Sequence, residues 1–444
     1  MRKTIKFTLI VALLFSYTGS AYLGNYSRLI KLVDANYAEL IMMRIGYFLQ
    51  AIGMFLYSFI FAKKSKTIPF INTFYTNVIL VFFSIIPMCF MQLSTNITII
   101  AISSFIFNIV TGMIFQLYLI QLAYNVNSNN LGLCFGVAYG IGSIFTFLVT
   151  YFDSGTFMES PAMTFIYIVM VTLSSILLLN SESIKEKQAV PLKNKESKYL
   201  SLLSACIILA TIVVALGDGI YNFGRWASEA DIRIVRAFYA FGLIFSGFIY
   251  DRSRRLGLIL TTAFLSYYII SAFLLNNVIS SSTMMSLGYF FMSFLTQYRY
   301  LSIVDISYDY PQFLPWAGYG LMISRVAEGL TALLMMSFPL SLTMHVVITL
   351  LFYSPLVILA IITDSIKYSS NSQTELQHIA KLCEKYSLTS REQEICELIL
   401  QNASDDEISE KLFISKPTVR FHISNILKKT NTKSRVEIRR LFEK

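Results

Sequence analysis

Apolar stretches of about 20 residues recur between residues 7 and 363, and they restrict the fold more than any other feature of this chain. A helix of about 20 apolar residues crosses the roughly 30 Å hydrocarbon layer of a bilayer, because it satisfies its backbone hydrogen bonds internally. Of the residues, 55% are hydrophobic and 14% charged, against about 25% charged in a typical soluble domain. The chain is therefore predicted to be all-α and to span a membrane.

Twelve of these stretches are predicted to be transmembrane helices. The segment from Met1 to Ala21 also resembles a secretory signal, with basic residues, an apolar stretch and small residues in that order. Its cleavage would leave the orientation of the later helices unchanged. The predicted spans are residues 7–23, 38–61, 74–93, 97–123, 131–152, 162–180, 199–217, 232–250, 256–275, 282–298, 313–338 and 340–363.

Positive charges are unequally distributed between the two sides of the predicted helices. Fifteen Lys and Arg residues lie on the side of the N-terminus and three on the opposite side. Because such residues are retained in cytoplasmic loops and twelve crossings are an even number, both termini are predicted to be cytoplasmic. The fifteen are Arg2, Lys3, Lys6, Lys63, Lys64, Lys66, Lys185, Lys187, Lys193, Lys195, Lys198, Arg252, Arg254, Arg255 and Arg299, and the three are Arg28, Lys31 and Arg225.

The basic segment 181–198 divides the helices into two sets of six, in residues 1–180 and 199–363. The loop between the eighth and ninth helices reads GFIYDRSRR, at residues 247–255. The arrangement resembles the major facilitator superfamily, whose members join two six-helix halves and carry a G-x-x-x-D-R-x-G-R-R loop. The resemblance implies that the carboxylate of Asp251 and its basic neighbours bridge helix ends. The loop after the second helix, residues 62–66, has the positive charge but lacks the aspartate.

The sequence becomes polar after Thr363, and residues 364–387 are predicted to be a linker and a short helix. One face of that helix is apolar. It could pack on the following domain or pair two chains in a brief coiled coil. Its residues are Leu376, Ile379, Cys383 and Tyr386.

Residues 388–444 contain start signals for four short helices. Thr389 with Glu392, and Ser404 with Glu407, form S/T-x-x-E capping boxes, in which the two side chains satisfy free backbone amides of the first turn. The third helix, after Ser415, has an apolar stripe at helical spacing. The stripe is Val419, Ile423, Ile426 and Leu427, and the outward arc is Lys416, Arg420, Phe421, Ser424 and Lys428.

This spacing resembles the LuxR-type DNA-binding domain, with its pattern L-T-x-R-E-x-E, E-I-A-x-x-L, I-S-x-x-T-V-K-x-H and I-x-x-K-L. Arg420 replaces the usual lysine, and Asn402 replaces the glycine after the first helix. A generic helical domain that binds protein or lipid is the alternative. The resemblance implies that the domain binds double-stranded DNA as a homodimer. It also implies base contacts by Arg420, Phe421 and Ser424 and phosphate contacts by Lys416, Thr418 and Lys428. His422 is a further member of the implied DNA-binding set.

Polar residues inside the predicted spans are candidates for a ligand site, because burying them in a membrane is costly. Arg325 and Glu328 lie three residues apart on one helix and could instead neutralise each other. The candidates are Arg44, Asn108, Gln116, Arg325 and Glu328.

These features, with the LuxR-type resemblance, predict a transcription regulator in a bacterial inner membrane that senses an unknown small molecule through its helices. The alternative is a transporter with an appended regulatory DNA-binding domain. The sequence offers no nucleophile with a base, no phosphate-binding loop and no metal-ligand cluster, so an enzyme, a cofactor and a metal are not expected.

Overall fold

The computed structural model describes residues 2–33, 38, 40–64, 73–151, 160–178, 189–192, 194–221, 231–274, 281–338, 340–400, 403–432 and 434–442. The chain divides into two compact units, Met1–Thr363 and Asp364–Lys444. Several of the counted charges lie outside the described residues, as does Asn402. These charges are Lys66, Lys185, Lys187, Lys193 and Arg225.

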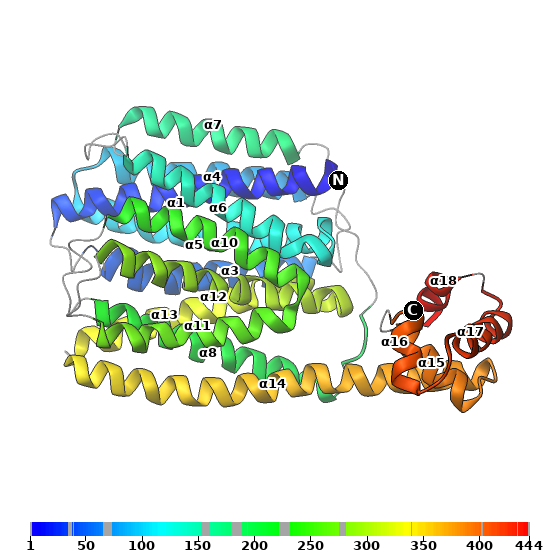
Figure 1. Cartoon of the computed structure of the whole chain (residues 1–444). Coiled ribbons are helices and arrows are strands. Elements are labelled where there is room, and N and C mark those ends of the chain that lie inside the picture. Colours follow the sequence, from blue (N-terminus) through cyan, green and yellow to red (C-terminus); the bar gives the residue numbers. More distant parts are fainter. Residues whose placement is uncertain are drawn as a thin grey trace. The chain divides into compact units, whose positions relative to one another are not determined.

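Long helices that run nearly parallel or antiparallel to one another form the first unit (Figure 1). Within the described residues there are twelve α-helices of 18 residues or more, accompanied by short π- and 3-10 segments. In chain order the elements are α1 (Arg2–Leu32), η1 (Leu40–Ile45), α3 (Gly46–Lys64), α4 (Thr73–Leu93), α5 (Ile97–Asn125), η2 (Ser128–Asn130), α6 (Leu131–Tyr151), α7 (Pro161–Leu178), α8 (Asn194–Tyr221), α10 (Ile232–Arg252), α11 (Arg254–Phe273), α12 (Ser281–Asp309), η3 (Pro311–Trp316), α13 (Tyr319–Ser337) and α14 (Leu342–Lys385).

Seven of these helices are long and apolar enough to cross a membrane, and three more are shorter apolar helices, in the part of the chain that the structure describes. Neither α12 nor α13 is among them. Both helices carry charged residues, namely Arg299 in α12 and Arg325 and Glu328 in α13, which lower their hydropathy. These charges face the interior of the bundle, as described below.

The ends of several predicted spans differ from the structure. The prediction that Arg299 lies in a loop is wrong, because α12 continues to Asp309 and the Arg299 side chain is buried within it. The first helix extends to Leu32, so Arg28 and Lys31 are helical as well. Arg28 donates a hydrogen bond to the Ser94 carbonyl over 2.8 Å. Polar groups that find partners allow a helix to continue past its apolar stretch.

Each half of the first unit has its own apolar core. One core is built mainly by α1 and α4–α7, around side chains such as Tyr17, Phe107 and Phe135. The other is built by α8 and α11–α14, around Leu203, Leu265 and Leu356. The halves meet where α6 packs on α10. Small residues allow two helix backbones to approach closely in a membrane.

Glycines make that contact between α6 and α10. A β-carbon on Gly132 would lie 2.5 Å from the carbonyl oxygen of Gly247, and one on Gly136 would lie 2.2 Å from that of Leu243. Gln297 of α12 donates a hydrogen bond to the Leu243 carbonyl over 2.9 Å. The two halves are thus in backbone contact along the first turns of α6.

A charged contact between the halves lies at the N-terminal end of α6. The carboxylate of Asp251 accepts hydrogen bonds from the backbone N–H groups of Gly132 and Leu133, each over 2.7 Å. Arg254 donates to Asp305 over 2.7 Å and to Asp251 over 3.2 Å. Free amides and the dipole at a helix N-terminus favour a negative charge. The GFIYDRSRR loop therefore joins helix ends, as the sequence resemblance implied.

The second unit contains the end of α14, from Asp364, and four short helices: α15 (Ser390–Leu400), α16 (Asp405–Leu412), α17 (Lys416–Thr430) and α18 (Arg435–Phe442). Their core contains Ile395, Ile408, Val419 and Ile426. The part of the predicted linker between Asp364 and Thr374 is helical, because α14 runs to Lys385. Cys383 is buried in this core, so this end of α14 packs on the following domain, which is one of the two predicted alternatives. The side chains of Leu376 and Ile379 are not among those that the structure describes.

Candidate DNA-binding and ligand-binding sites

The α16–turn–α17 segment begins each of its helices at a capped residue. Ser404 and Glu407 form the predicted capping box at α16. Phe413 ends α16 in the left-handed conformation, with φ of 52°, and Ser415 accepts a hydrogen bond from the Thr418 amide over 3.3 Å at the start of α17. Two helices joined by a tight turn in this way have the geometry of a helix-turn-helix.

The predicted outward arc of α17 is exposed in the structure. Val419, Ile423 and Ile426 are buried, whereas the side chain of Arg420 is 73% exposed and Phe421 is 63% exposed. Ser424 and the two arc lysines are exposed, Thr418 is half-buried beside the Ser415 hydroxyl, and His422 is half-buried. The base-contacting and phosphate-contacting roles of these residues stay predictions.

Acidic residues of the first turn of α16 are paired with this arc. Asp405 accepts a hydrogen bond from Arg420 over 3.1 Å and also pairs with Arg435, and Asp406 pairs with Lys416. Ion pairs between exposed side chains contribute about 0–1 kcal/mol. A guanidinium held this weakly can exchange its partner for a base or a phosphate at little cost.

A buried carboxylate connects α15 to α17 in the core of the second unit. Glu392 is 3% exposed, and its carboxylate accepts hydrogen bonds from the Thr389 amide over 2.8 Å and from Lys429 over 2.6 Å. Burial alone would raise the pKa of Glu392, but the bonds from Lys429 and Thr389 outweigh it and hold that pKa below its usual range. The predicted capping box at Thr389 is formed, and its Glu392 carboxylate also holds α17 through Lys429.

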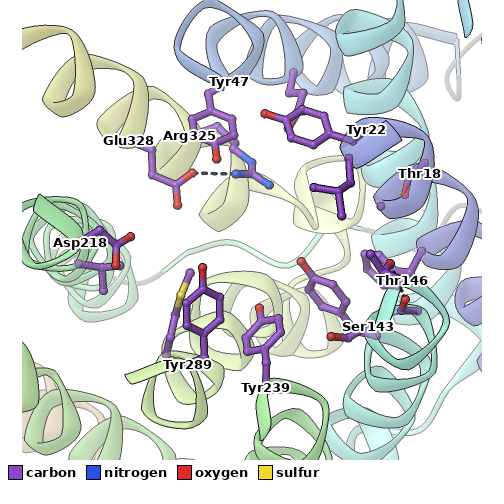
Figure 2. A pocket seen from close by; sticks show the side chains of 18 of the residues that line it. Thr18, Tyr22, Tyr47, Ser143, Thr146, Asp218, Tyr239, Tyr289, Arg325 and Glu328 are labelled. Atoms are coloured by element: carbon purple, nitrogen blue, oxygen red, sulfur yellow. Dashed lines mark hydrogen bonds and ion pairs between the residues drawn. The ribbon is translucent and has the colours of Figure 1, made fainter. Parts of the chain in front are cut away.

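The first unit contains a cavity of about 560 Å³ between its halves, lined by α1, η1, α3, α5 and α6 on one side and by α8, α10, α12 and α13 on the other (Figure 2). Arg44, Arg325 and Glu328 line it, so the structure brings together three of the five predicted ligand residues. Arg44 donates to the Ala332 carbonyl over 3.1 Å.

Glu328 is shared by two arginines in this cavity. It pairs with Arg325 over 2.8 Å and also with Arg299 from the neighbouring helix α12. The guanidinium of Arg325 lies 4.5 Å above the ring of Tyr47. The neutralisation that the sequence offered as an alternative is therefore present, but one carboxylate serves two cations.

Asn108 and Gln116 do not line the cavity. Asn108 is fully buried, where it accepts a hydrogen bond from Gln50 over 2.8 Å and donates to Ser104. Gln116 donates to the Pro315 carbonyl over 2.8 Å. Both amides join helices to their neighbours, which is the ordinary use of a polar side chain within a helical bundle.

Sequence reasoning missed several cavity residues. Arg299 was assigned to a loop because the apolar stretch ends before it. Asp218 and Arg236 lie near ends of apolar stretches, where a charge is unremarkable. The cavity tyrosines gave no signal, since aromatic residues are frequent throughout this chain. They are Tyr22, Tyr47, Tyr139, Tyr239 and Tyr289.

These features define a helical bundle in two halves, with a charged central cavity, in one chain with a helix-turn-helix domain. Residues 386–442 match the family described as bacterial regulatory proteins, luxR family. The spore germination protein GerE of Bacillus subtilis is 47% identical over 60 residues, which are 13% of this chain and 81% of that protein. A nitrate/nitrite response regulator protein homolog of Haemophilus influenzae is 45% identical over 56 residues, which are 13% of this chain and 27% of that protein. Through its C-terminal domain the chain belongs to the luxR family.

The bundle is similar to solved transporters of the major facilitator superfamily. The human organic anion transporter MFSD10 aligns with a TM-score of 0.60 and 11% identity, over 82% of this chain and 99% of that one. A variant of the E. coli fucose:proton symporter FucP aligns with a TM-score of 0.57 and 14% identity, over 81% and 98%. The all-helical fold class, the LuxR-type domain and the major-facilitator-like fold of the bundle, all predicted from the sequence, are confirmed. The chain combines a LuxR-type DNA-binding regulator domain with a transporter-like membrane fold.

Proposed function

We propose that this protein is a transcription regulator that senses a small molecule through its membrane helices and controls transcription through its LuxR-type domain. The observation that carries the proposal is the presence, in one chain, of a luxR-family domain and of a bundle whose two halves enclose a charged cavity. Residues 1–363 would bind the ligand, residues 364–387 would connect the units, and residues 388–444 would bind DNA.

The proposed signal is a change in how the two halves of the bundle pack. A ligand shifts such an equilibrium only as far as it binds one arrangement better than the other, by about 1.4 kcal/mol for each tenfold difference in affinity. The cavity is lined by both halves, and Asp251 joins them at the N-terminus of α6. Movement of one half against the other would therefore alter the cavity and this contact together.

On DNA, we propose that α17 enters the major groove and that Arg420 reads a base. Arginine can donate two parallel hydrogen bonds to guanine there, a contact that discriminates by about 1–3 kcal/mol, whereas phosphate contacts only position the domain. A homodimer would bind two half-sites about one helical turn apart. Lys416, Thr418 and Lys428 would contact phosphates, and Phe421, His422 and Ser424 would lie beside the bases.

We place the protein in a bacterial inner membrane with both termini in the cytoplasm. Without the buried Arg299, fourteen of the fifteen basic residues remain on the N-terminal side, against three on the other. This bias still favours a cytoplasmic N-terminus. Twelve crossings would return the DNA-binding domain to the compartment that contains the chromosome.

The second candidate function is active transport by the same bundle. It is favoured by the overall similarity to proteins described as an organic anion transporter and a fucose:proton symporter. That similarity concerns the fold alone, at 11–14% identity. Uptake of a ligand by vesicles that contain the protein, and not by vesicles without it, would support transport.

The experiment that tests the regulator is genome-wide occupancy of the full-length protein in intact cells, beside Arg420→Ala and with membrane localisation measured in the same samples. Lys411→Ala, which removes an exposed charge outside the predicted contacts, is the matched control. We expect discrete sites for the wild type and the control that are lost in Arg420→Ala. An absence of sites under all growth conditions would contradict the proposal.

A further inference from the structure

We infer that the central cavity binds a small organic oxyanion, such as a carboxylate or a phosphate, carried on an apolar or aromatic body. The inference deepens the proposed sensing function by naming the class of ligand. It rests on the charges, hydrogen-bonding groups and lining of the cavity.

Positive charge exceeds negative charge in this cavity. Among the described residues, four arginines and two carboxylates line it, a formal excess of two positive charges. The arginines come from four different elements, so they converge on the cavity from several directions. They are Arg44 of η1, Arg236 of α10, Arg299 of α12 and Arg325 of α13, and the carboxylates are Asp218 of α8 and Glu328 of α13.

The carboxylates do not balance this excess. Glu328 is already shared between Arg299 and Arg325, whose side chains are only 4% and 12% exposed. Asp218 is exposed to the cavity, on the opposite side from Tyr22 and Thr146 (Figure 2). One carboxylate thus serves two buried arginines, and burying two positive charges beside a single negative charge is unfavourable. A bound anion would offset that excess.

Buried N–H groups of the same arginines also lack acceptors. The Nε atoms of Arg236, Arg299 and Arg325 have no hydrogen-bond partner within the described part of the protein. Arg236 lies on α10, lines the same cavity as Arg325 and Glu328 on α13, and has no ion pair with a described carboxylate. An oxyanion is the acceptor that a guanidinium binds most strongly.

The rest of the lining indicates the body of the ligand. Five tyrosines and the ring of Phe15 face the cavity, together with methionines such as Met285 and Met292. The ring of Phe15 stacks on that of Tyr139 with centroids 4.3 Å apart. A volume of about 560 Å³ is within the roughly 300–1,000 Å³ of small-molecule sites. Such walls favour an apolar or aromatic group attached to the anion.

Binding to the purified full-length protein in detergent tests this inference without DNA or transport. The probes are benzoate, phenyl phosphate and phenyl sulfate, each compared with neutral benzyl alcohol and cationic benzylammonium at constant ionic strength. The readout is the Tm and the Kd derived from its dependence on probe concentration. We expect at least one oxyanion to raise the Tm, and both reference compounds to leave it unchanged.

The variants Arg236→Gln and Arg236→Lys locate the binding site. Loss of a charge-assisted hydrogen bond should weaken anion binding about tenfold or more in the glutamine variant, and less in the lysine variant. The inference is overturned if no oxyanion binds the wild type better than its neutral counterpart, or if Arg236→Gln binds as tightly as the wild type. Anion binding without any change in DNA occupancy would contradict the sensing function alone.

Discussion

Asp251, at the end of α10, accepts a hydrogen bond over 2.7 Å from the backbone N–H of Gly132, at the start of α6 in the other half of the bundle. The second oxygen of the same carboxylate accepts the N–H of Leu133. A charge placed on a free helix N-terminus contributes about 0.3–1 kcal/mol at an exposed position and up to about 2 kcal/mol when partly buried. This contact is therefore a modest contribution that holds one end of the two halves together.

We expect Asp251→Asn to weaken the contact and to favour separation of the halves at this end. An amide keeps the size of the side chain but has neither the charge nor two acceptor oxygens. Hydrogen exchange of the first amides of α6 should become faster, and basal DNA occupancy should change. Asp309→Asn, at the exposed end of α12, is the control; equal exchange in both variants would contradict the assigned role.

Arg420→Ala and Lys428→Ala should differ in kind on DNA. Loss of the base contact should cost about 1–3 kcal/mol and relax the preference at one position of the site. Loss of the phosphate contact should weaken binding to all sequences. It should also reduce the slope of log K against log salt concentration by about one. Binding of the full-length variants to randomised DNA at several salt concentrations measures the sequence preference and the salt dependence. Identical sequence preferences in the two variants would refute the face assignment.

Glu392 makes the stability of the second unit dependent on pH. Its pKa is lowered in the folded state, so its contribution is present above the pKa of the unfolded chain and is lost as the pH falls through the folded value. We expect Glu392→Gln to lower the Tm of this unit at neutral pH, and the difference from the wild type to shrink in acid. Glu397→Gln, exposed on the same helix, should have little effect. A difference that does not depend on pH would argue against the Lys429 pairing.

The features that follow a period or a local motif could be predicted from the sequence. The capping boxes at Thr389 and Ser404 depend on residues three apart, and the outward arc of α17 depends on helical spacing. Twelve apolar stretches likewise predict twelve helices. Local chemistry determines each of these features.

The cavity could not be predicted in the same way, because it depends on which helices meet. Arg299 and Glu328 are 29 residues apart in the chain and pair across two helices. The hydropathy of the stretch that ends at residue 298 indicates a loop after it, and only the packing of α12 on α13 gives Arg299 a partner. Asn108 and Arg44 are both polar residues in apolar stretches, yet only Arg44 lines the cavity.

Glu328→Gln should destabilise the bundle strongly, because it leaves Arg299 and Arg325 buried without their shared carboxylate. Breaking a buried ion pair by removal of one partner costs about 3–5 kcal/mol. We expect a clear drop in Tm of the detergent-purified protein. Asp218→Asn, which removes a carboxylate exposed to the same cavity, should change the Tm much less. Equal effects of the two substitutions would show that the shared pairing does not stabilise the bundle.

Gly136→Ala should separate α6 from α10, and with them the two halves. The added β-carbon would lie 2.2 Å from the Leu243 carbonyl oxygen, a backbone atom that cannot rotate away. The helices must move apart, which also stretches the Gln297 hydrogen bond to that carbonyl. Overpacking of a tight interior usually costs about 1–3 kcal/mol. We expect a lower Tm and an altered DNA occupancy in Gly136→Ala.

In Gly19→Ala the new β-carbon would make only an ordinary 3.5 Å contact with Thr146, so its Tm should be unchanged. If Gly136→Ala behaves like Gly19→Ala, the α6–α10 contact is not the tight interface that joins the halves.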